Sequence, residues 1–531
     1  MPPAEYRGLT ERIAAGEDVA PEELRASFLA AEDYPARMER LADLELQAFA
    51  IVEDEPLKLG SLGTAILDTY YGSLTGHYVL ARFYRHLENE DAASVHDAWI
   101  ERIQAYMLAS ADKAADGETY LKAVTAIEAQ VYALSRGLTP VGSIYQTTST
   151  VQFALLVQAT PAEGPLQTLN FDLSSLYEGM RTSFGAAEGD DEFSPLNLVG
   201  FLAKEGDTAA QTAVGAFLAT QGRLDDAVNW LRAASRTGNL VASSLLARIF
   251  WEQARQTEDD EERQRFLDET LENYLHAVAL GSSDAMYALG VLYLNGHFGE
   301  DNVVAGLPLL MQAAEQDHSD AILFLAHLHY AGEAVDKDID AARAYYVRAA
   351  ELGNPFAQRS YARFLLDRST AQAGDPRVIA WLEDLADDDD PEAMLLLGNL
   401  TARGLGTRAS TRGAIRWYQR AVDTAPLEAR IVNEVAWTLT VSEQLDLRRA
   451  DYAREIMDRL MNENEQARAR PEYLDTWAAT YAANGDFERA AALQEEALAI
   501  AEDGEFAEVE DILREHLERF RAGQTLSEGV P

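Results

Sequence analysis

The fold is decided by residues 321–353, which read AILFLAHLHYAGEAVDKDIDAARAYYVRAAELG. Apolar residues such as Ala321 and Leu325 recur about one helical turn apart at the start of this stretch. Gly332 then breaks the pattern, and a second apolar stripe follows over 342–350. The stretch therefore predicts a helix, a turn and a second helix.

The same unit recurs along the chain at intervals of 36 residues. A small residue marks each unit at the same place: Ala285, Ala321, Ala357, Ala393 and Ala429. Large side chains stand 12 positions before the later four of these alanines and before Ala242: Leu309, Tyr345, Trp381, Trp417 and Trp230. Small residues let successive hairpins approach closely, and the large side chains fill the layer between them. The repeats therefore predict a superhelical stack whose concave wall is lined by the first helix of each hairpin.

The order of these residues resembles the Sel1-like repeat family, whose units carry an alanine, Leu-Gly, Tyr, Gly, Asp, Trp-Tyr, Ala-Ala and a final Gly. The Leu-Gly pair recurs at Gly290 and Gly398, and the resemblance covers about 285–429. Residues 474–490 are similar to tetratricopeptide repeats, which share the helical-hairpin architecture. Together the two resemblances imply one continuous solenoid over about 207–521.

The first part of the chain follows a different pattern. Residues 21–137 show amphipathic helical periods, whereas 141–159 and 166–173 are rich in β-branched and aromatic residues and predict two or three antiparallel strands. The expected fold class is therefore mainly α, a helical-hairpin superhelical solenoid preceded by an α-helical domain with a small antiparallel β-sheet. The expected boundaries are 1–177 for the N-terminal domain, 178–206 for a linker, 207–429 for Sel1-like repeats, 430–521 for TPR-like repeats and 522–531 for a frayed tail.

The N-terminal domain carries His77, His96 with Trp99 and Ile103, and Phe171 in its helical and strand segments. With these residues the domain resembles an uncharacterised bacterial domain family of unknown function. The resemblance implies a fold and little chemistry. Four polar residues of this domain, His77, His96, Asp112 and Asp116, could form a polar site, which is the one plausible enzymatic constellation. The same side chains could equally pack and cap helices.

The composition excludes several classes of function. The chain has 531 residues, and 44 basic against 89 acidic residues give a formal net charge of −45, so nucleic-acid binding is not expected. Cysteine is absent, which makes thiolate zinc sites and cysteine nucleophiles impossible. No phosphate-binding glycine loop, nucleophile elbow or metalloprotease motif occurs, and we expect no enzyme activity, no cofactor and no metal. No apolar run is long enough to span a bilayer, so we expect no membrane span and a cytoplasmic location.

Helical spacing assigns the residues that should line the concave wall. They are aromatic, apolar and polar side chains together with arginines: Tyr287, Val291, Leu294, Leu323, His327, Tyr330, Arg359, Arg363, Leu395, Asn399 and Arg403. Aromatic side chains supply contact area and arginine can grip a carboxylate, so this set is typical of a peptide-binding groove. The alternative is a solvated helix surface whose arginines pair with nearby carboxylates of the chain itself.

The expected function is a non-enzymatic adaptor that binds a peptide or protein in this groove. Arg359, Arg363 and Arg403 would select segments that carry carboxylates, and the acidic outer face could recruit a basic partner. Two alternatives stay open at this point. The N-terminal domain could be an enzyme or small-ligand receptor regulated by the repeats, or the protein could be a structural component of an assembly.

Overall fold

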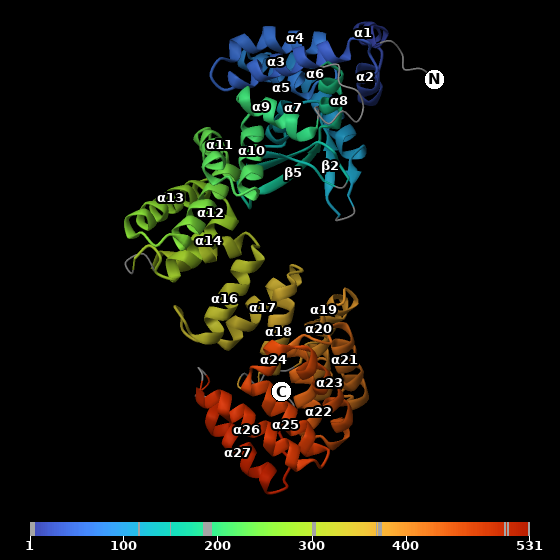
Figure 1. Ribbon diagram of the computed structural model, residues 1–531. Coiled ribbons are helices and arrows are strands. Elements are labelled where there is room, and N and C mark those ends of the chain that lie inside the picture. The colour runs from blue at the N-terminus through green and yellow to red at the C-terminus, as the bar shows by residue number, and fades with distance from the viewer. Residues whose placement is uncertain are drawn as a thin grey trace. The chain divides into compact units, whose positions relative to one another are not determined.

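The computed structural model describes residues 6–114, 117–148, 150–183, 194–299, 304–367, 369, 374–503, 506 and 509–528 (Figure 1). Its elements are mainly helices, as the sequence predicts. Contacts group the chain into two compact units, Met1–Gln316 and Asp317–Pro531. No described helix is both long enough and apolar enough to cross a membrane.

Helices from separate parts of the N-terminal segment pack around one core in the first unit. They are α1 (Tyr6–Ala14), α2 (Pro21–Leu29), α3 (Tyr34–Ala50), α4 (Leu59–Thr69), α5 (Leu74–His86), α6 (Glu90–Ala109) and α7 (Ala126–Ser135). The rings of Phe28 and Tyr70 stack with centroids 4.4 Å apart, and Tyr6 meets Phe28 edge to face at 5.8 Å. Aromatic pairs of this kind stabilise a core beyond the burial of their area.

A small mixed sheet adjoins these helices, with the strand order β1-β2-β5-β4-β3. The strands are β1 (Asp112–Lys113), β2 (Thr119–Lys122), β3 (Leu138–Gln146), β4 (Ala154–Pro161) and β5 (Gln167–Asp172). The sequence predicts two or three antiparallel strands over 141–159 and 166–173, and β3, β4 and β5 pair antiparallel there. It does not predict β1 or β2, and β2 pairs with β5 in parallel, so the sheet is mixed rather than antiparallel. The chain passes through α7, β3 and β4 between β2 and β5, and this longer path lets β5 return beside β2 in the same direction.

The segment expected to be a linker, residues 178–206, contains more helix than its composition suggests. Helix α8 (Ser174–Ser183) begins before it and extends into it, and α9 (Pro195–Lys204) lies within it. Ser194 caps α9 by accepting a hydrogen bond from the backbone N–H of Asn197 at 3.3 Å, and Pro195 stands at the first helical position. Residues 184–193 lie outside the described part of the chain.

Helical hairpins begin at α10 and continue to the end of the first unit. They comprise α10 (Thr208–Thr220), α11 (Leu224–Arg236), α12 (Leu240–Gln256), α13 (Asp260–Ala279), α14 (Ser283–Leu294) and α15 (Gly306–Glu315). The acidic tract 258–262 lies at the start of α13, where negative charge suits the positive end of the helix dipole. Helices α12 and α13 are longer than their counterparts, and this accounts for the wider spacing between Ala242 and Ala285.

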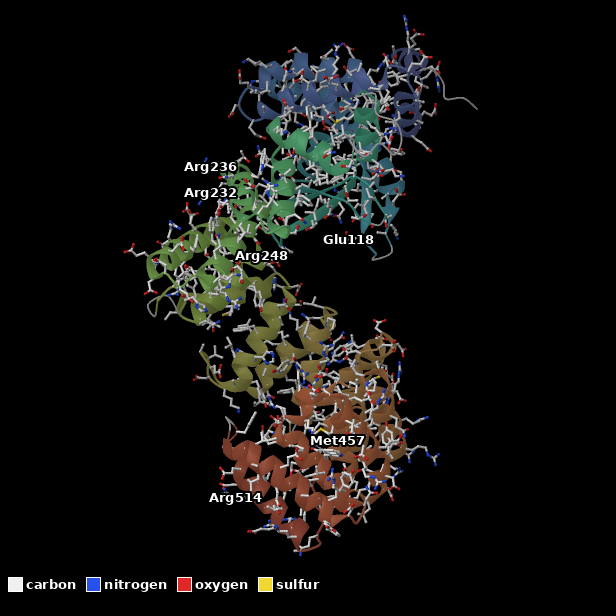
Figure 2. All side chains as sticks on the ribbon, in the orientation of Figure 1. Glu118, Arg232, Arg236, Arg248, Met457 and Arg514 are labelled. Atoms are coloured by element: carbon white, nitrogen blue, oxygen red, sulfur yellow. The ribbon has the colours of Figure 1, made fainter. Side chains whose placement is uncertain are left out.

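The second unit continues with the same hairpins (Figure 1). Its longer helices are α16 (Ser319–Ala331), α17 (Ile339–Glu351), α18 (Pro355–Leu366), α19 (Pro376–Asp387), α20 (Pro391–Arg403), α21 (Thr411–Thr424), α22 (Ala429–Val441), α23 (Ala450–Glu463), α25 (Pro471–Ala483), α26 (Phe487–Asp503) and α27 (Glu510–Arg521). The repeated alanines Ala321, Ala357 and Ala393 are all fully buried. A Cβ atom on Gly398 would lie 2.3 Å from the ring of Tyr418, which explains why the Leu-Gly position excludes a side chain. Met457, labelled in Figure 2, is buried in the core of this unit.

The C-terminal residues pack on α22 where the sequence predicts a frayed tail over 522–531. The backbone N–H of Glu528 donates to the carbonyl of Val441 at 2.7 Å, and Glu443 N–H donates to the carbonyl of Glu528 at 2.8 Å. Trp437 Nε1 donates to the Glu528 carboxylate at 2.7 Å, and Leu526 is buried. Residues 522–528 therefore form part of the second unit, and 529–531 lie outside the described residues.

Candidate functional site

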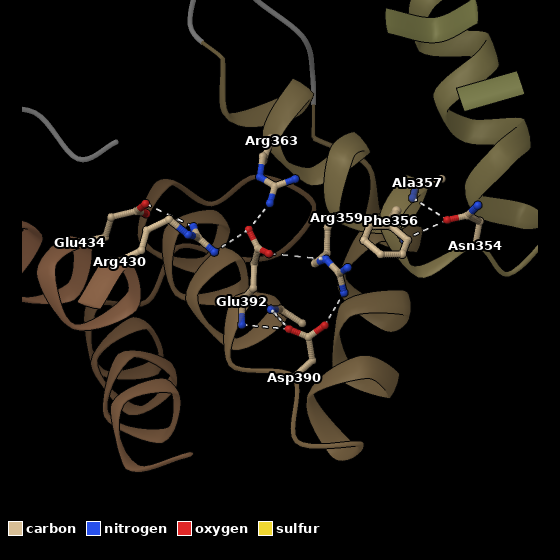
Figure 3. A network of polar contacts seen from close by, with 10 residues as sticks. Asn354, Phe356, Ala357, Arg359, Arg363, Asp390, Glu392, Arg430 and Glu434 are labelled. Carbon is tan, nitrogen blue, oxygen red and sulfur yellow. Dashed lines mark hydrogen bonds and ion pairs between the residues drawn. The ribbon is translucent and has the colours of Figure 1, made fainter. Parts of the chain in front are cut away.

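Three first helices of consecutive hairpins, α18, α20 and α22, carry a row of ion pairs in the second unit (Figure 3). Arg359 and Arg363 lie one turn apart on α18. Asp390 caps α20 by accepting hydrogen bonds from the backbone N–H groups of Glu392 at 2.9 Å and Ala393 at 3.0 Å. These cap hydrogen bonds hold the Asp390 carboxylate in a fixed position, so Arg359 has a rigid ion-pair partner.

Glu392 lies at the centre of this row. Its carboxylate pairs with Arg363, lies 3.6 Å from Nε of Arg359 and lies 3.1 Å from Nη2 of Arg430, while Arg359 also pairs with Asp390. Arg430 in turn pairs with Glu434 at 3.4 Å. We call Arg359, Arg363, Asp390, Glu392, Arg430 and Glu434 the arginine ladder. The pairs of Asp390 and Glu392 with Arg359, Arg363 and Arg430 join one repeat to the next, so the ladder ties α18, α20 and α22 together.

The two arginines of α18 differ in how much of their side chain reaches solvent. Arg359 is 13 % exposed and Arg363 is 50 % exposed. Arg359 is therefore held firmly by Asp390 and Glu392. Arg363 keeps half of its surface open, and Glu392 would retain two other arginines if Arg363 turned to a new partner.

A hollow of about 210 Å³ lies beside Arg363 on the first-helix side of α16 and α18, against α17. We call it the α16–α18 pocket, and its lining is aromatic and polar: His327, Tyr330, Tyr346, Ser360, Arg363 and Phe364. A hydrogen bond of 2.9 Å joins His327 Nδ1 to the Tyr346 hydroxyl. Partial burial, with the nearby charge of Arg363, lowers the pKa of His327, so this ring is neutral at pH 7 and Arg363 is the cation of the pocket.

The pocket unites His327, Tyr330 and Arg363, three of the residues that helical spacing assigns to the concave wall. Tyr330 donates a hydrogen bond to Asp367, and its ring meets Phe364 edge to face at 5.9 Å. Leu323 is half-buried on the same helix as His327. Aromatic walls around a half-exposed guanidinium are the kind of surface that anchors a partner side chain.

Other assigned positions lie elsewhere. Leu395 and Asn399 are buried, and Asn399 accepts a hydrogen bond of 2.7 Å from the hydroxyl of Tyr418 inside the hairpin. These two residues therefore belong to the core of their repeat and offer no wall to a ligand. Arg403 donates to the backbone carbonyl of Leu366, where it fastens the end of α18.

The remaining assigned positions, Tyr287, Val291 and Leu294, are half-buried on α14 of the first unit. The sequence leaves open whether the arginines face a ligand or the chain's own acids. For Arg359 the structure places those acids within contact, since Asp390 and Glu392 come from the start of the next repeat. The sequence contains a signal for this pairing, because acidic residues stand 31 and 33 positions after Arg359, near the repeat spacing that identifies the wall.

The polar residues expected to gather in the N-terminal domain do so only in part. His77 Nδ1 lies 3.0 Å from His96 Nδ1, and His77 Nε2 donates to the Tyr71 carbonyl at 2.9 Å. Burial lowers the pKa of His77 to about 3, so its ring is neutral and accepts a hydrogen bond from His96 through Nδ1. Its ring stacks on Trp99 at 5.3 Å. The pair therefore packs α5 against α6.

The other two members of that set do not join the histidines. Asp112 forms an ion pair of 3.2 Å with Lys122 across the β1–β2 hairpin. Asp116 lies outside the described residues. Among the described residues, no group of three or more histidines and carboxylates could hold a metal ion.

A buried pair of carboxyl groups, Glu45 on α3 and Glu128 on α7, is not predicted by the sequence. Glu128 accepts hydrogen bonds from the backbone N–H groups of Val124 at 2.6 Å and Leu74 at 3.2 Å. Burial, and then the charge of Glu128, raises the pKa of Glu45 to about 8. Ser73 donates to Glu45 at 2.7 Å, and both carboxyl groups are buried among α3, α5 and α7. Thr125 caps α7 by accepting a hydrogen bond from the Glu128 N–H at 3.0 Å, and the Thr-x-x-Glu pattern of these two residues is the only sequence signal of the pair.

Comparison with known proteins places repeats of one family in this chain. Residues 283–318, 319–354 and 391–423 match the Sel1 repeat. An uncharacterized protein of Neisseria meningitidis serogroup B, NMB1327, is 25 % identical over 228 residues, which cover 43 % of this chain and 46 % of that protein. The Sel1-repeat-containing protein YjcO of Escherichia coli K12 is 26 % identical over 152 residues, which cover 28 % of this chain and 64 % of YjcO. The chain thus spans less than two thirds of the length of either relative.

Two solved structures are similar to this chain. The Sel1 repeat protein from Oxalobacter formigenes has a TM-score of 0.35 and 23 % identity, and the match covers 42 % of this chain and 89 % of that one. The protein c5321, a protective antigen of uropathogenic Escherichia coli strains with an SLR fold, has a TM-score of 0.44 and 16 % identity, and covers 96 % of this chain and 99 % of that one. From the repeat matches and the buried alanines at their spacing, we conclude that this chain contains Sel1 repeats and folds there as helical hairpins.

Proposed function

We propose that the protein is a non-enzymatic interaction scaffold that binds a peptide or protein partner at the α16–α18 pocket. Helical hairpins of this type are interaction modules in general, because stacked first helices present a continuous surface. The observation that carries the proposal is the pocket itself. It combines aromatic walls with a half-exposed arginine, and His327, Tyr330 and Arg363 come from two successive first helices.

On binding, a carboxylate of the partner would replace the carboxylate of Glu392 as the ion-pair partner of Arg363. A partner carboxylate can approach the open half of this guanidinium, and Glu392 keeps its ion pairs with Arg359 and Arg430 when it does. The exchange therefore leaves no buried charge without a partner. Tyr330 and Phe364 would supply apolar contact area beside the new ion pair.

The acids of the arginine ladder determine which partners the α16–α18 pocket can bind. Asp390, Glu392 and Glu434 surround the arginines, so a partner needs one carboxylate placed at Arg363 rather than a long acidic run. This refines the expected role of the arginine row, in which Arg359, Arg363 and Arg403 act together. The excess of acidic residues elsewhere would repel other acidic proteins and favour a basic flank on the partner.

The test captures partners of the full chain from its native host and identifies them by mass spectrometry. Captures with Arg363→Ala and with Arg408→Ala are run in parallel, because Arg408 is exposed on a loop of the same unit and changes the net charge equally. The proposal expects a protein whose recovery falls with Arg363→Ala and not with Arg408→Ala. Recovery of the same proteins by both variants would refute it. Fractionation of the host in the same experiment tests the expected cytoplasmic location.

A further inference from the structure

A second hollow, of about 500 Å³, lies in the second unit on the other helix of the hairpins. It is bounded by α21, by the 3₁₀ turn η4 (Leu445–Leu447) and by the start of α23. We call it the α21 pocket. It shares no residue with the α16–α18 pocket, so it requires a function of its own.

The α21 pocket is basic in a strongly acidic chain. Arg412, Arg416 and Arg449 line it, against the single carboxylate of Asp446. Within the described part of the chain, Arg412 and Arg416 make no hydrogen bond or ion pair, whereas most arginines discussed above are paired with acids. Arg449 donates only to backbone carbonyls, those of Asp446 at 3.0 Å and Arg448 at 2.6 Å. The lining therefore carries a net positive charge, three arginines against one carboxylate.

The positions of these arginines are unfavourable for the free protein. Arg412 lies in the first turn of α21 and Arg449 at the N-cap of α23, where the helix dipole disfavours a cation. Arg412 and Arg416 are also like charges one turn apart on one helix face. An anion in the pocket would relieve both effects, so the site gains more from an anionic ligand than isolated surface arginines would.

The apolar part of the lining indicates what kind of anion fits. Leu445 is 73 % exposed on η4, and the buried Ile415 lies between Arg412 and Arg416 on α21. Leu445 thus gives the lining an exposed apolar side chain that an apolar side chain of a peptide can contact. Asp446 also lies in the lining and would repel a compact dianion such as phosphate. We propose that the α21 pocket binds an acidic peptide segment that carries an apolar side chain for Leu445.

This site goes beyond the scaffold function proposed above, because that function uses the first helices and this pocket uses the second ones. A protein with both sites could hold two partners, one on each side of its hairpins. The two proposals can be tested separately, because a variant at Arg363 and a double variant at Arg412 and Arg416 change different pockets. A negative result for one pocket therefore leaves the proposal for the other intact.

The experiment selects random dodecapeptides displayed on phage against the full chain and against the Arg412→Glu, Arg416→Glu double variant. Both arginines are exposed, so their reversal leaves the core intact. Arg408→Glu is the matched control, because Arg408 is exposed three residues before α21 and does not line the pocket. Leu445→Ala tests the apolar contact. Selected peptides are then synthesised, and their affinity is measured by fluorescence polarisation.

The proposal expects acidic peptides with a central apolar residue, whose affinity falls about tenfold or more in the double variant and less than about twofold in Arg408→Glu. Their binding should weaken as salt rises and should survive Arg363→Ala. Absence of any selected peptide that depends on Arg412 and Arg416 would overturn the proposal. Displacement of the peptide by inorganic phosphate, at an ionic strength matched with chloride, would overturn it too and would assign the pocket to a small anion.

Discussion

Glu392 Oε1 lies 3.1 Å from Nη2 of Arg430, and this contact joins α20 to α22 across the boundary between two repeats. The same carboxylate pairs with Arg363 on α18. One acid thus connects three consecutive first helices. Its position, two residues after the cap of α20, is set by the cap and by the 36-residue period together.

Removal of this acid should weaken the second unit. Glu392→Gln leaves the side chain in place but withdraws its charge from three arginines, of which Arg359 is mostly buried. We expect a loss of about 1–2 kcal/mol in the free energy of unfolding. Urea unfolding followed by circular dichroism measures it. Glu463→Gln is the control, because Glu463 pairs only at 3.8 Å with the exposed Arg459 and should cost less than about 0.5 kcal/mol.

Substitution of Arg359 should affect mainly the stability of the protein, whereas substitution of Arg363 should affect mainly partner binding. Arg359→Met removes the partner of the capping residue Asp390 and should lower the free energy of unfolding by about 1–2 kcal/mol. Arg363→Met removes a half-exposed side chain and should cost less than about 0.5 kcal/mol. Thermal unfolding of both variants tests this order. Equal costs would mean that Glu392 holds Arg363 as firmly as the two acids hold Arg359, and would weaken the exchange proposed for Arg363.

The carboxyl pair in the first unit should make its stability depend on pH. The pKa of Glu45 is raised to about 8 in the folded chain, well above its usual 4.5, so the folded state holds a proton that the unfolded state releases. This contribution is complete below about pH 4.5 and is lost as the pH rises towards about 8. Glu45→Gln, a neutral side chain of the same shape, should flatten the fall in melting temperature between about pH 5 and about pH 8. An unchanged slope would show that Glu45 is ionised in the folded state.

The C-terminal segment should stabilise the second unit. Truncation after Gln524 removes the buried Leu526 and both backbone hydrogen bonds of Glu528, and we expect a loss of about 2 kcal/mol. Truncation after Glu528 keeps Leu526 and both backbone hydrogen bonds and is the control, with an unfolding midpoint above that of the shorter chain. Urea unfolding of the two truncated chains makes the comparison. Similar midpoints would show that the contact with Trp437 and Val441 carries no net free energy.

The repeats could be predicted because their signal is local and periodic. Ala321 and Ala357 recur at the repeat spacing, and both are buried between hairpins as that spacing requires. The parallel pairing of β2 with β5 could not be predicted, since strand order depends on contacts between residues far apart in the sequence. The burial of Leu526 in the second unit could not be predicted either, because a single apolar residue in a short polar segment carries no periodic pattern.

The candidate site was predictable in part. Helical spacing finds His327, Tyr330 and Arg363, which share the α16–α18 pocket. It fails at Asn399, which stands at the corresponding position of a later repeat but accepts a hydrogen bond from Tyr418 in the core. The way in which each hairpin packs against its neighbours decides whether the side chain at a given repeat position faces solvent. The α21 pocket was missed because its basic character depends on which arginines lack an acidic neighbour in space.

Site-specific photocrosslinking in the native host tests directly whether a protein partner occupies the α16–α18 pocket. A photoreactive phenylalanine analogue replaces Ser360 in the pocket, and the same analogue replaces the exposed Asp384 on the second helix α19 as a control. We expect a discrete protein adduct at Ser360 that is absent at Asp384 and is lost when Arg363→Ala is added. Adducts that are equal at the two positions, or that survive Arg363→Ala, would contradict this expectation.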